Sequence, residues 1–187
     1  MRMRNSAKGY GAVAIALHWL VAVLVLAAWF TGELGDSMPR ASHEVGLFIH
    51  ISLGLALFGT AFVRLGWRLF DPPPALEPSK LGGRFGAWAG RVVEMVHLLT
   101  YALMFAIPVL GIVTQFARGF PLPVFGLFEI PSPWIGDRAF MHNMKELHET
   151  LANGLMVIVG LHAAAALVHH YVLRDRTLLR MMPGAQS

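Results

Sequence analysis

Histidine is the residue type most able to do chemistry in this chain, which contains nine histidines and no cysteine. The lack of cysteine excludes disulfides, iron–sulfur clusters, thiolate metal ligands and thiol catalysis. Several histidines lie inside strongly apolar segments, where an ionisable side chain is costly and usually faces the protein interior to perform a function. Neutral imidazole is a good ligand for transition metals. The sequence therefore points first to metal or cofactor chemistry inside a membrane.

Two histidines of the last apolar segment, His148 and His162, are fourteen residues apart. Fourteen residues are close to four helical turns, so both side chains share one face and lie roughly 21 Å apart along the axis. That separation suits two cofactors, one in each leaflet. Matching depth pairs His50 with His148 on one side of the membrane, and His162 with either His18 or His97 on the other. Two histidines on one haem iron leave no open coordination position, which favours electron transfer.

Membrane histidines can also serve in packing, in zinc catalysis or in proton relays. A lone histidine in a span is more often a hydrogen-bonded packing residue than a ligand, but pairs at matched depth favour ligation. A zinc-protease helix fails, because His148-Glu149 is followed by Ala152 where a second histidine is required. A proton-relay transporter would need interrupted, paired helices, which the spans lack. We interpret His97 as a hydrogen-bonded residue close to Glu94; a haem ligand, or a polar partner of a haem propionate or a quinone, is the alternative.

Four apolar segments must position these histidines. Charged residues make up only 14% of the chain, against about 25% in soluble domains. The segments cover about residues 11–31, 45–63, 92–115 and 149–173, each near the ~20 residues that cross a bilayer. We therefore predict an all-α integral membrane four-helix bundle, one domain over residues 1–187. The first segment is expected to be a retained helix rather than a signal peptide, because its apolar stretch is too long.

Basic residues predict the orientation of the spans. Eleven of the fifteen Lys and Arg residues lie before the first segment, between the second and third, and after the fourth: Arg2, Arg4, Lys8, Arg64, Arg68, Lys80, Arg84, Arg91, Arg174, Arg176 and Arg180. The positive-inside rule then places both termini in the cytoplasm. Because these cations flank apolar spans, they indicate membrane topology and not nucleic-acid binding.

Several motifs resemble the bacterial cytochrome b-561 family. They are KELHETLAN at 145–153, LHAAAALVHHY at 161–171 and TLLRMMP at 177–183, with His18-Trp19-Leu20 and Ile49-His50. The similarity runs through essentially the whole chain. It implies a four-helix protein of the bacterial inner membrane with two haems b, which passes single electrons between the quinone pool and a partner or small oxidant.

The resemblance also implies particular site residues. The implied haem ligands are His50 with His148, and His18 with His162. The implied activity is superoxide oxidation to oxygen on the periplasmic side, coupled to ubiquinone reduction near the cytoplasmic side. His169 matches a position implicated in quinone binding. Lys80 is the only lysine of its connecting segment and stands for a lysine of that site, although the spacing around it departs from the family.

His169 is a candidate proton donor to the quinone. It lies seven residues beyond His162 on the same helical stripe, about 10 Å further toward the cytoplasm. Its imidazole could supply a proton there; the alternative is a histidine that merely lies at the interface. A positive outer surface would favour the superoxide anion, but the outer segments are acidic in total, so this substrate follows from the resemblance alone.

An electron-conducting subunit docked to a periplasmic redox enzyme, as in hydrogenases and formate dehydrogenases, is the alternative function.

Overall fold

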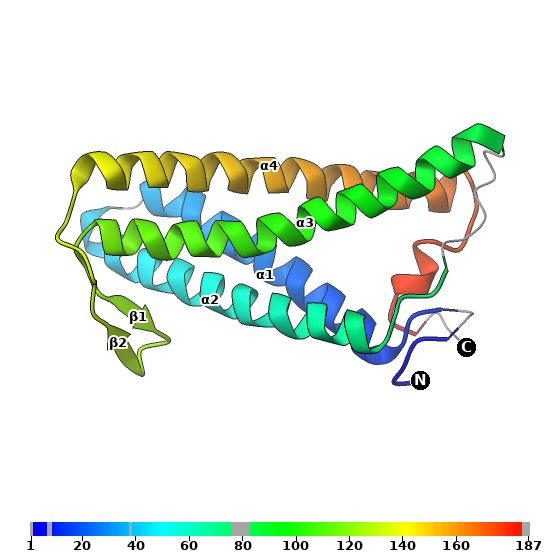
Figure 1. Cartoon of the computed structure of the whole chain (residues 1–187), viewed down its shortest axis with the longest axis horizontal. Helices are drawn as coiled ribbons and strands as arrows, with labels where there is room; N and C mark the ends of the chain where they lie inside the picture. Colours follow the sequence, from blue (N-terminus) through cyan, green and yellow to red (C-terminus); the bar gives the residue numbers. More distant parts are fainter. Residues whose placement is uncertain (1, 7–8, 38, 76–82, 185–187) are drawn as a thin grey trace. The chain divides into compact units, whose positions relative to one another are not determined.

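The computed structural model describes residues 2–6, 9–37, 39–75 and 83–184. Figure 1 shows its long helices, which are α1 (Ala12–Ser37), α2 (Arg40–Phe70), α3 (Gly83–Ala117) and α4 (Arg138–Tyr171). Two short strands, β1 (Leu122–Val124) and β2 (Phe128–Ile130), pair as an antiparallel hairpin between α3 and α4. A 3-10 turn, η1 (Leu179–Met181), follows α4.

Each long helix contains a stretch apolar enough to cross a membrane. The four stretches are Ala12–Gly35, Ser42–Phe70, Gly90–Ala117 and Arg138–Tyr171. Large apolar side chains on them are exposed; Leu98 is 73% and Leu161 66% accessible. Such exposure is costly in water but is satisfied by lipid, while the helices bond their own backbone groups. The predicted all-α class with four membrane spans is confirmed.

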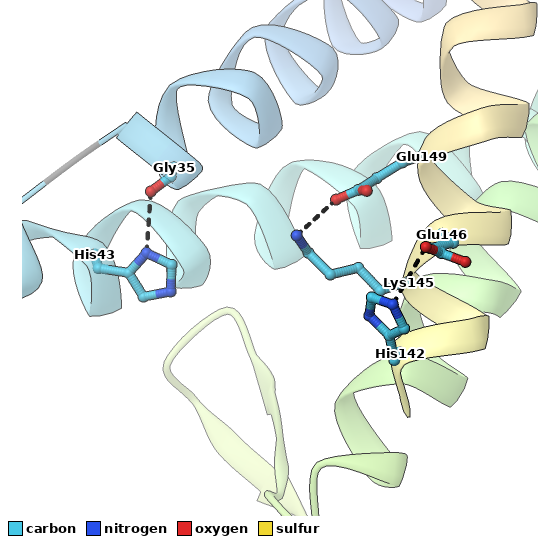
Figure 2. A network of polar contacts seen from close by, with 6 residues as sticks. All are labelled: Gly35, His43, His142, Lys145, Glu146 and Glu149. Atoms are coloured by element: carbon cyan, nitrogen blue, oxygen red, sulfur yellow. Dashed lines mark hydrogen bonds and ion pairs between the residues drawn. The ribbon is translucent and has the colours of Figure 1, made fainter. Parts of the chain in front are cut away.

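Helix α4 begins eleven residues before the predicted span, at Arg138 instead of residue 149. Asp137 caps it, because its Oδ1 accepts the Phe140 N–H at 3.0 Å. An ion pair between Lys145 and Glu149, at 2.9 Å and one turn apart, supports the polar first turns (Figure 2). Hydropathy alone misses these turns, because they extend the helix with charged residues.

The described residues fall into two compact units, and every long helix contributes a segment to each. One unit, here called the terminal unit, comprises Met1–Trp19, Phe62–Ala102 and Leu155–Ser187. The other, the hairpin unit, comprises Leu20–Ala61 and Leu103–Gly154. The predicted partners His50 and His148 both belong to the hairpin unit.

In the hairpin unit, hydrogen bonds fix the chain between α3 and α4. Gln115 is buried and its Nε2 donates to the Pro121 carbonyl at 2.8 Å. Gly119 has φ +77°, and a Cβ there would lie 3.1 Å from the Gly136 nitrogen. Two glycines thus allow the two ends of this connection to approach, which places the start of α4 beside the end of α3.

In the terminal unit, Asn5 ties the N-terminal segment to the end of α2. Its Nδ2 donates to the carbonyls of Asp71 and Pro72 at 2.9 and 3.0 Å, and its Oδ1 accepts the buried Gly11 N–H at 2.8 Å. The Asn5 N–H donates to the Asp71 carboxylate at 2.8 Å. One side chain therefore holds the start of α1 against the end of α2.

Candidate functional site

The hairpin unit brings the imidazole rings of His50 of α2 and His148 of α4 close together, in an edge-on arrangement. Their ring centroids are 5.9 Å apart and their planes differ by 79°. Metal–imidazole bonds are about 2 Å long, so two rings on opposite sides of one metal ion have centroids roughly 6 Å apart. The observed separation therefore suits two ligands of one metal.

Both rings are oriented by main-chain carbonyls of other helices. His50 Nδ1 lies 2.9 Å from the Ala28 oxygen of α1, and His148 Nδ1 lies 2.9 Å from the Ile107 oxygen of α3. Because a carbonyl only accepts, each Nδ1 carries the proton and each Nε2 is left with a free lone pair. A ring N–H held by a carbonyl in this way is typical of metal-binding histidines.

A cavity of about 590 Å³ surrounds the two rings. That volume falls within the ~300–1,000 Å³ of cofactor sites. Its walls are largely apolar, and Gly54, one turn after His50, leaves open space because a Cβ there would meet nothing within 4 Å. Trp29 and Asn153 also line it, and the Trp29 Nε1–H donates to Asn153 Oδ1 at 2.8 Å. The residues present can therefore hold a large flat cofactor between the two imidazoles.

Charged residues near the cavity are drawn in part in Figure 2, where Lys145 reaches Glu149. The cavity lining includes the cations Arg118 and Lys145 and the carboxylates Glu33 and Glu149. The Nδ1 of His43, another lining residue, donates to the Gly35 carbonyl at 3.0 Å (Figure 2). The segments predicted to lie outside are acidic in total, but the formal charges of these four lining residues balance.

Three imidazoles meet in the terminal unit. The ring centroid of His162 lies 6.3 Å from that of His18, with planes at 61°, and 5.9 Å from that of His97, with planes at 83°. Both separations suit two ligands of one metal. The two alternatives for the partner of His162 therefore both remain geometrically open.

Hydrogen bonds distinguish the two candidate partners. His97 Nδ1 donates to the Val93 carbonyl at 2.7 Å, which leaves its Nε2 free; this carbonyl, and not Glu94, is the partner observed for His97. At His18 the Arg64 guanidinium donates to Nδ1 at 3.1 Å. Arginine has no acceptor, so His18 carries its proton on Nε2. Ligation by His18 Nε2 therefore requires Arg64 to release Nδ1.

Two arginines surround Tyr101 close to these histidines. The guanidinium carbons of Arg64 and Arg68 lie 5.7 and 5.9 Å from the Tyr101 ring centroid. The indole N–H of Trp67 is buried and has no hydrogen-bond partner among the described residues. All four residues line a small cavity of about 40 Å³ together with His97. These groups form a cationic, donor-rich environment that suits carboxylates.

At the end of α4, His169 pairs with Asp175. Arg174 adopts a positive φ of 51°, and the Asp175 N–H donates to the His169 carbonyl at 3.1 Å. His169 Nδ1 donates to Asp175 Oδ2 at 2.5 Å, while Asp175 Oδ1 accepts the Thr177 N–H at 2.9 Å. Burial alone would raise the pKa of the Asp175 carboxyl, but the hydrogen bonds from His169 and Thr177 hold that pKa below its usual value. The other predicted quinone residue, Lys80, lies outside the described residues.

The pairing at matched depth was predictable, but its supporting groups were not. The carbonyls of Ala28 and Ile107, the guanidinium of Arg64 and the carboxylate of Asp175 carry no recognisable motif in the sequence. Asp175 alone offers a local signal, since it lies six residues after His169 at a helix end. Whether the four paired histidines bind haem stays a prediction.

Paired imidazoles beside a cofactor-sized cavity, in a chain with four membrane spans, define a class: the membrane cytochromes of the b type. A family profile for prokaryotic cytochrome b561 matches residues 9–184, and the chain belongs to that family. Membership implies haem b binding and electron transfer in a membrane.

Curated relatives cover nearly the whole chain. A protein of Yersinia pestis named "Probable superoxide oxidase CybB" is 36% identical over 94% of this chain and 97% of its own. "Cytochrome b561 homolog 2" of Escherichia coli (strain K12) is 33% identical over 100% and 98%. "Cytochrome b562" of Cereibacter sphaeroides is 31% identical over 93% and 95%. The family is therefore shared along the full length of the chain.

Proposed function

We propose that this protein is an inner-membrane oxidoreductase with two haems b, which transfers electrons from periplasmic superoxide to ubiquinone. The observation that carries the proposal is the His50–His148 pair, whose ring centroids lie 5.9 Å apart beside a cavity of about 590 Å³. The relative named as a probable superoxide oxidase supports the substrate. The distribution of basic residues supports cytoplasmic termini. The chain acts as one domain, since every spanning helix contributes a segment to both units.

Each histidine has a stated role. His50 and His148 would hold the outer haem through Nε2, while their Nδ1–H groups stay on main-chain carbonyls. His162 would hold the inner haem together with His18, as the family resemblance implies, with His97 as the alternative partner. Haem iron held by two imidazoles has no open position and carries one electron at a time.

The reaction balances over two substrate molecules. Two superoxide anions each lose one electron and become oxygen; ubiquinone takes up the two electrons and two protons and becomes ubiquinol. Arg118 and Lys145 offset the lining carboxylates Glu33 and Glu149, so that an anion can reach the outer haem edge.

Residues of the terminal unit serve the quinone and the inner haem. His169, hydrogen-bonded to Asp175, holds a proton that it can pass to reduced quinone. Arg64 and Arg68 supply positive charge, and Trp67 supplies a buried N–H, for the carboxylates of the inner haem.

A pyridine haemochrome assay tests the cofactor proposal. The purified protein should contain two haems b per chain. His148→Ala should retain one haem, and so should His162→Ala. Comparing His18→Ala with His97→Ala identifies the inner ligand, because only the ligand variant loses a haem. Two haems in His148→Ala would refute the outer site.

An assay with an enzymatic superoxide source tests the substrate. The purified wild-type protein should reduce ubiquinone without any other protein, and superoxide dismutase should abolish the reduction. Reduction that persists with superoxide dismutase, or that needs an added protein, would refute superoxide as the donor.

The hairpin favours a second candidate, an electron-conducting subunit that docks to a redox enzyme. Leu127 is 80%, Phe128 58% and Ile135 95% exposed in or beside the hairpin. Exposed apolar clusters frequently mark interaction sites. Affinity purification under mild detergent distinguishes the functions, since a subunit should co-purify with a redox partner and a free-standing oxidase should not.

A further inference from the structure

The same local arrangement orients both histidines of the hairpin unit. His50 bonds the carbonyl of Ala28, and its ring lies against Gly32, four residues further along α1. His148 bonds the carbonyl of Ile107, and its ring lies against Gly111, four residues further along α3. In both cases a histidine of one helix contacts a carbonyl and the glycine one turn beyond it.

Helix geometry explains this spacing of four residues. A helical side chain points back toward the N-terminus and covers the turn before its own Cα. The side chain of residue i+4 therefore shields the carbonyl of residue i. That carbonyl has two lone pairs, and the intrahelical bond uses one. Glycine at i+4 leaves room for an outside donor to reach this oxygen; at Ala28 the Thr31 hydroxyl also donates to it, at 3.0 Å.

We propose that Gly32 and Gly111 are positioning residues: they open the carbonyls of Ala28 and Ile107 to the Nδ1–H groups of His50 and His148. The proposal rests on the proposed haem site. The two carbonyls fix the tautomer and the ring orientation of both proposed ligands. The glycines thereby determine how strongly the outer haem is held, although neither is a ligand.

Steric distances give the consequence of adding a methyl group. A Cβ at Gly32 would lie 3.1 Å from His50 Cε1, and one at Gly111 would lie 3.2 Å from His148 Cε1. Both distances are shorter than ordinary van der Waals contact, so each ring must shift by a few tenths of an ångström, which disturbs its hydrogen bond to the carbonyl. Loss of a hydrogen bond that orients a metal ligand typically costs about 10- to 100-fold in metal affinity. We therefore expect weaker binding of the outer haem only.

The chain offers matched controls for this substitution. Gly59 of α2 and Gly154 of α4 lie in helices of the same unit, and a Cβ at either would meet nothing within 4 Å. Gly59→Ala and Gly154→Ala therefore add the same methyl group without touching a histidine ring. A general effect of replacing glycine by alanine in a long helix of this unit would appear in both controls.

The experiment measures the transfer of haem from purified protein in detergent to an excess of apo-globin. Gly32→Ala and Gly111→Ala should each release one of the two haems about tenfold faster than wild type, with the second haem unaffected. Electron paramagnetic resonance of the oxidised protein should show a shifted low-spin signal for the outer haem alone. The two control variants should match wild type in both measurements.

Each further outcome has a definite meaning. Glycine variants that match their controls would overturn the proposal. Loss of both haems from a glycine variant would also overturn it, because the expected effect is confined to one haem. His148→Ala serves as the reference. If this variant retains both haems, the proposed haem site itself is refuted. If it loses one haem while the glycine variants behave like wild type, only the role of the glycines is refuted.

Discussion

Replacing Asp175 by asparagine tests whether its carboxylate prepares His169 for proton transfer to quinone. In the wild-type protein, Asp175 Oδ2 accepts the His169 Nδ1 proton at 2.5 Å and Oδ1 accepts the Thr177 N–H at 2.9 Å. Asparagine can keep the second bond through its amide oxygen, so the turn after α4 should persist. The substitution removes the negative charge that the wild-type carboxylate places beside the imidazole.

The size of the effect follows from the exposure of the pair. A hydrogen bond to a charged group contributes about 1.5–3 kcal/mol. The Asp175 side chain is 9% exposed, but that of His169 is 35% exposed, so solvent screening favours the lower end of this range. We therefore expect a loss of about 1.5 kcal/mol, which is roughly a tenfold decrease in the rate of quinone reduction.

The assay compares wild type, Asp175→Asn and His169→Ala. Haem content and the rate of haem reduction by a chemical donor should be equal in all three proteins. The kcat for ubiquinone should fall about tenfold in Asp175→Asn, and at least as far in His169→Ala. If kcat is unchanged in Asp175→Asn but falls in His169→Ala, the role of the carboxylate is refuted. If kcat is unchanged in both variants, the quinone role of His169 is refuted.

Three further predictions concern charge and stability. Arg118→Gln should slow superoxide-driven haem reduction about threefold at low ionic strength and little at high salt, because steering is screened; a salt-independent effect would contradict this. Asn5→Ala should lower the free energy of unfolding by about 2 kcal/mol. The substitution removes three side-chain hydrogen bonds worth about 0.5–1.5 kcal/mol each and leaves the buried Gly11 N–H unpaired. Thermal unfolding followed by haem absorbance measures the loss. The lowered pKa of Asp175 means that its carboxylate stabilises the fold above about pH 4 and that this contribution is lost as the pH falls through the lowered value. The stability difference between wild type and Asp175→Asn should therefore shrink at acidic pH.

The number of spans and the depth of the histidines were readable from the sequence, because both depend on local regularities. Apolar length predicts a span, and the helical repeat places His148 and His162 on one face whatever surrounds them. Hydropathy could not find the start of α4, since Asp137 and the Lys145–Glu149 pair extend the helix with polar residues. A helix begins at its cap, which need not coincide with the edge of the membrane.

The sequence by itself determined that paired histidines lie at matched depths on four membrane helices. Only the tertiary structure decided which groups those histidines contact. His50 and His148 use carbonyls that glycines of neighbouring helices expose, whereas the Nδ1 of His18 accepts a hydrogen bond from Arg64. Every residue has a carbonyl, so no residue type marks the ones that serve as partners. Packing selects them, because it sets which turn of a neighbouring helix faces each imidazole.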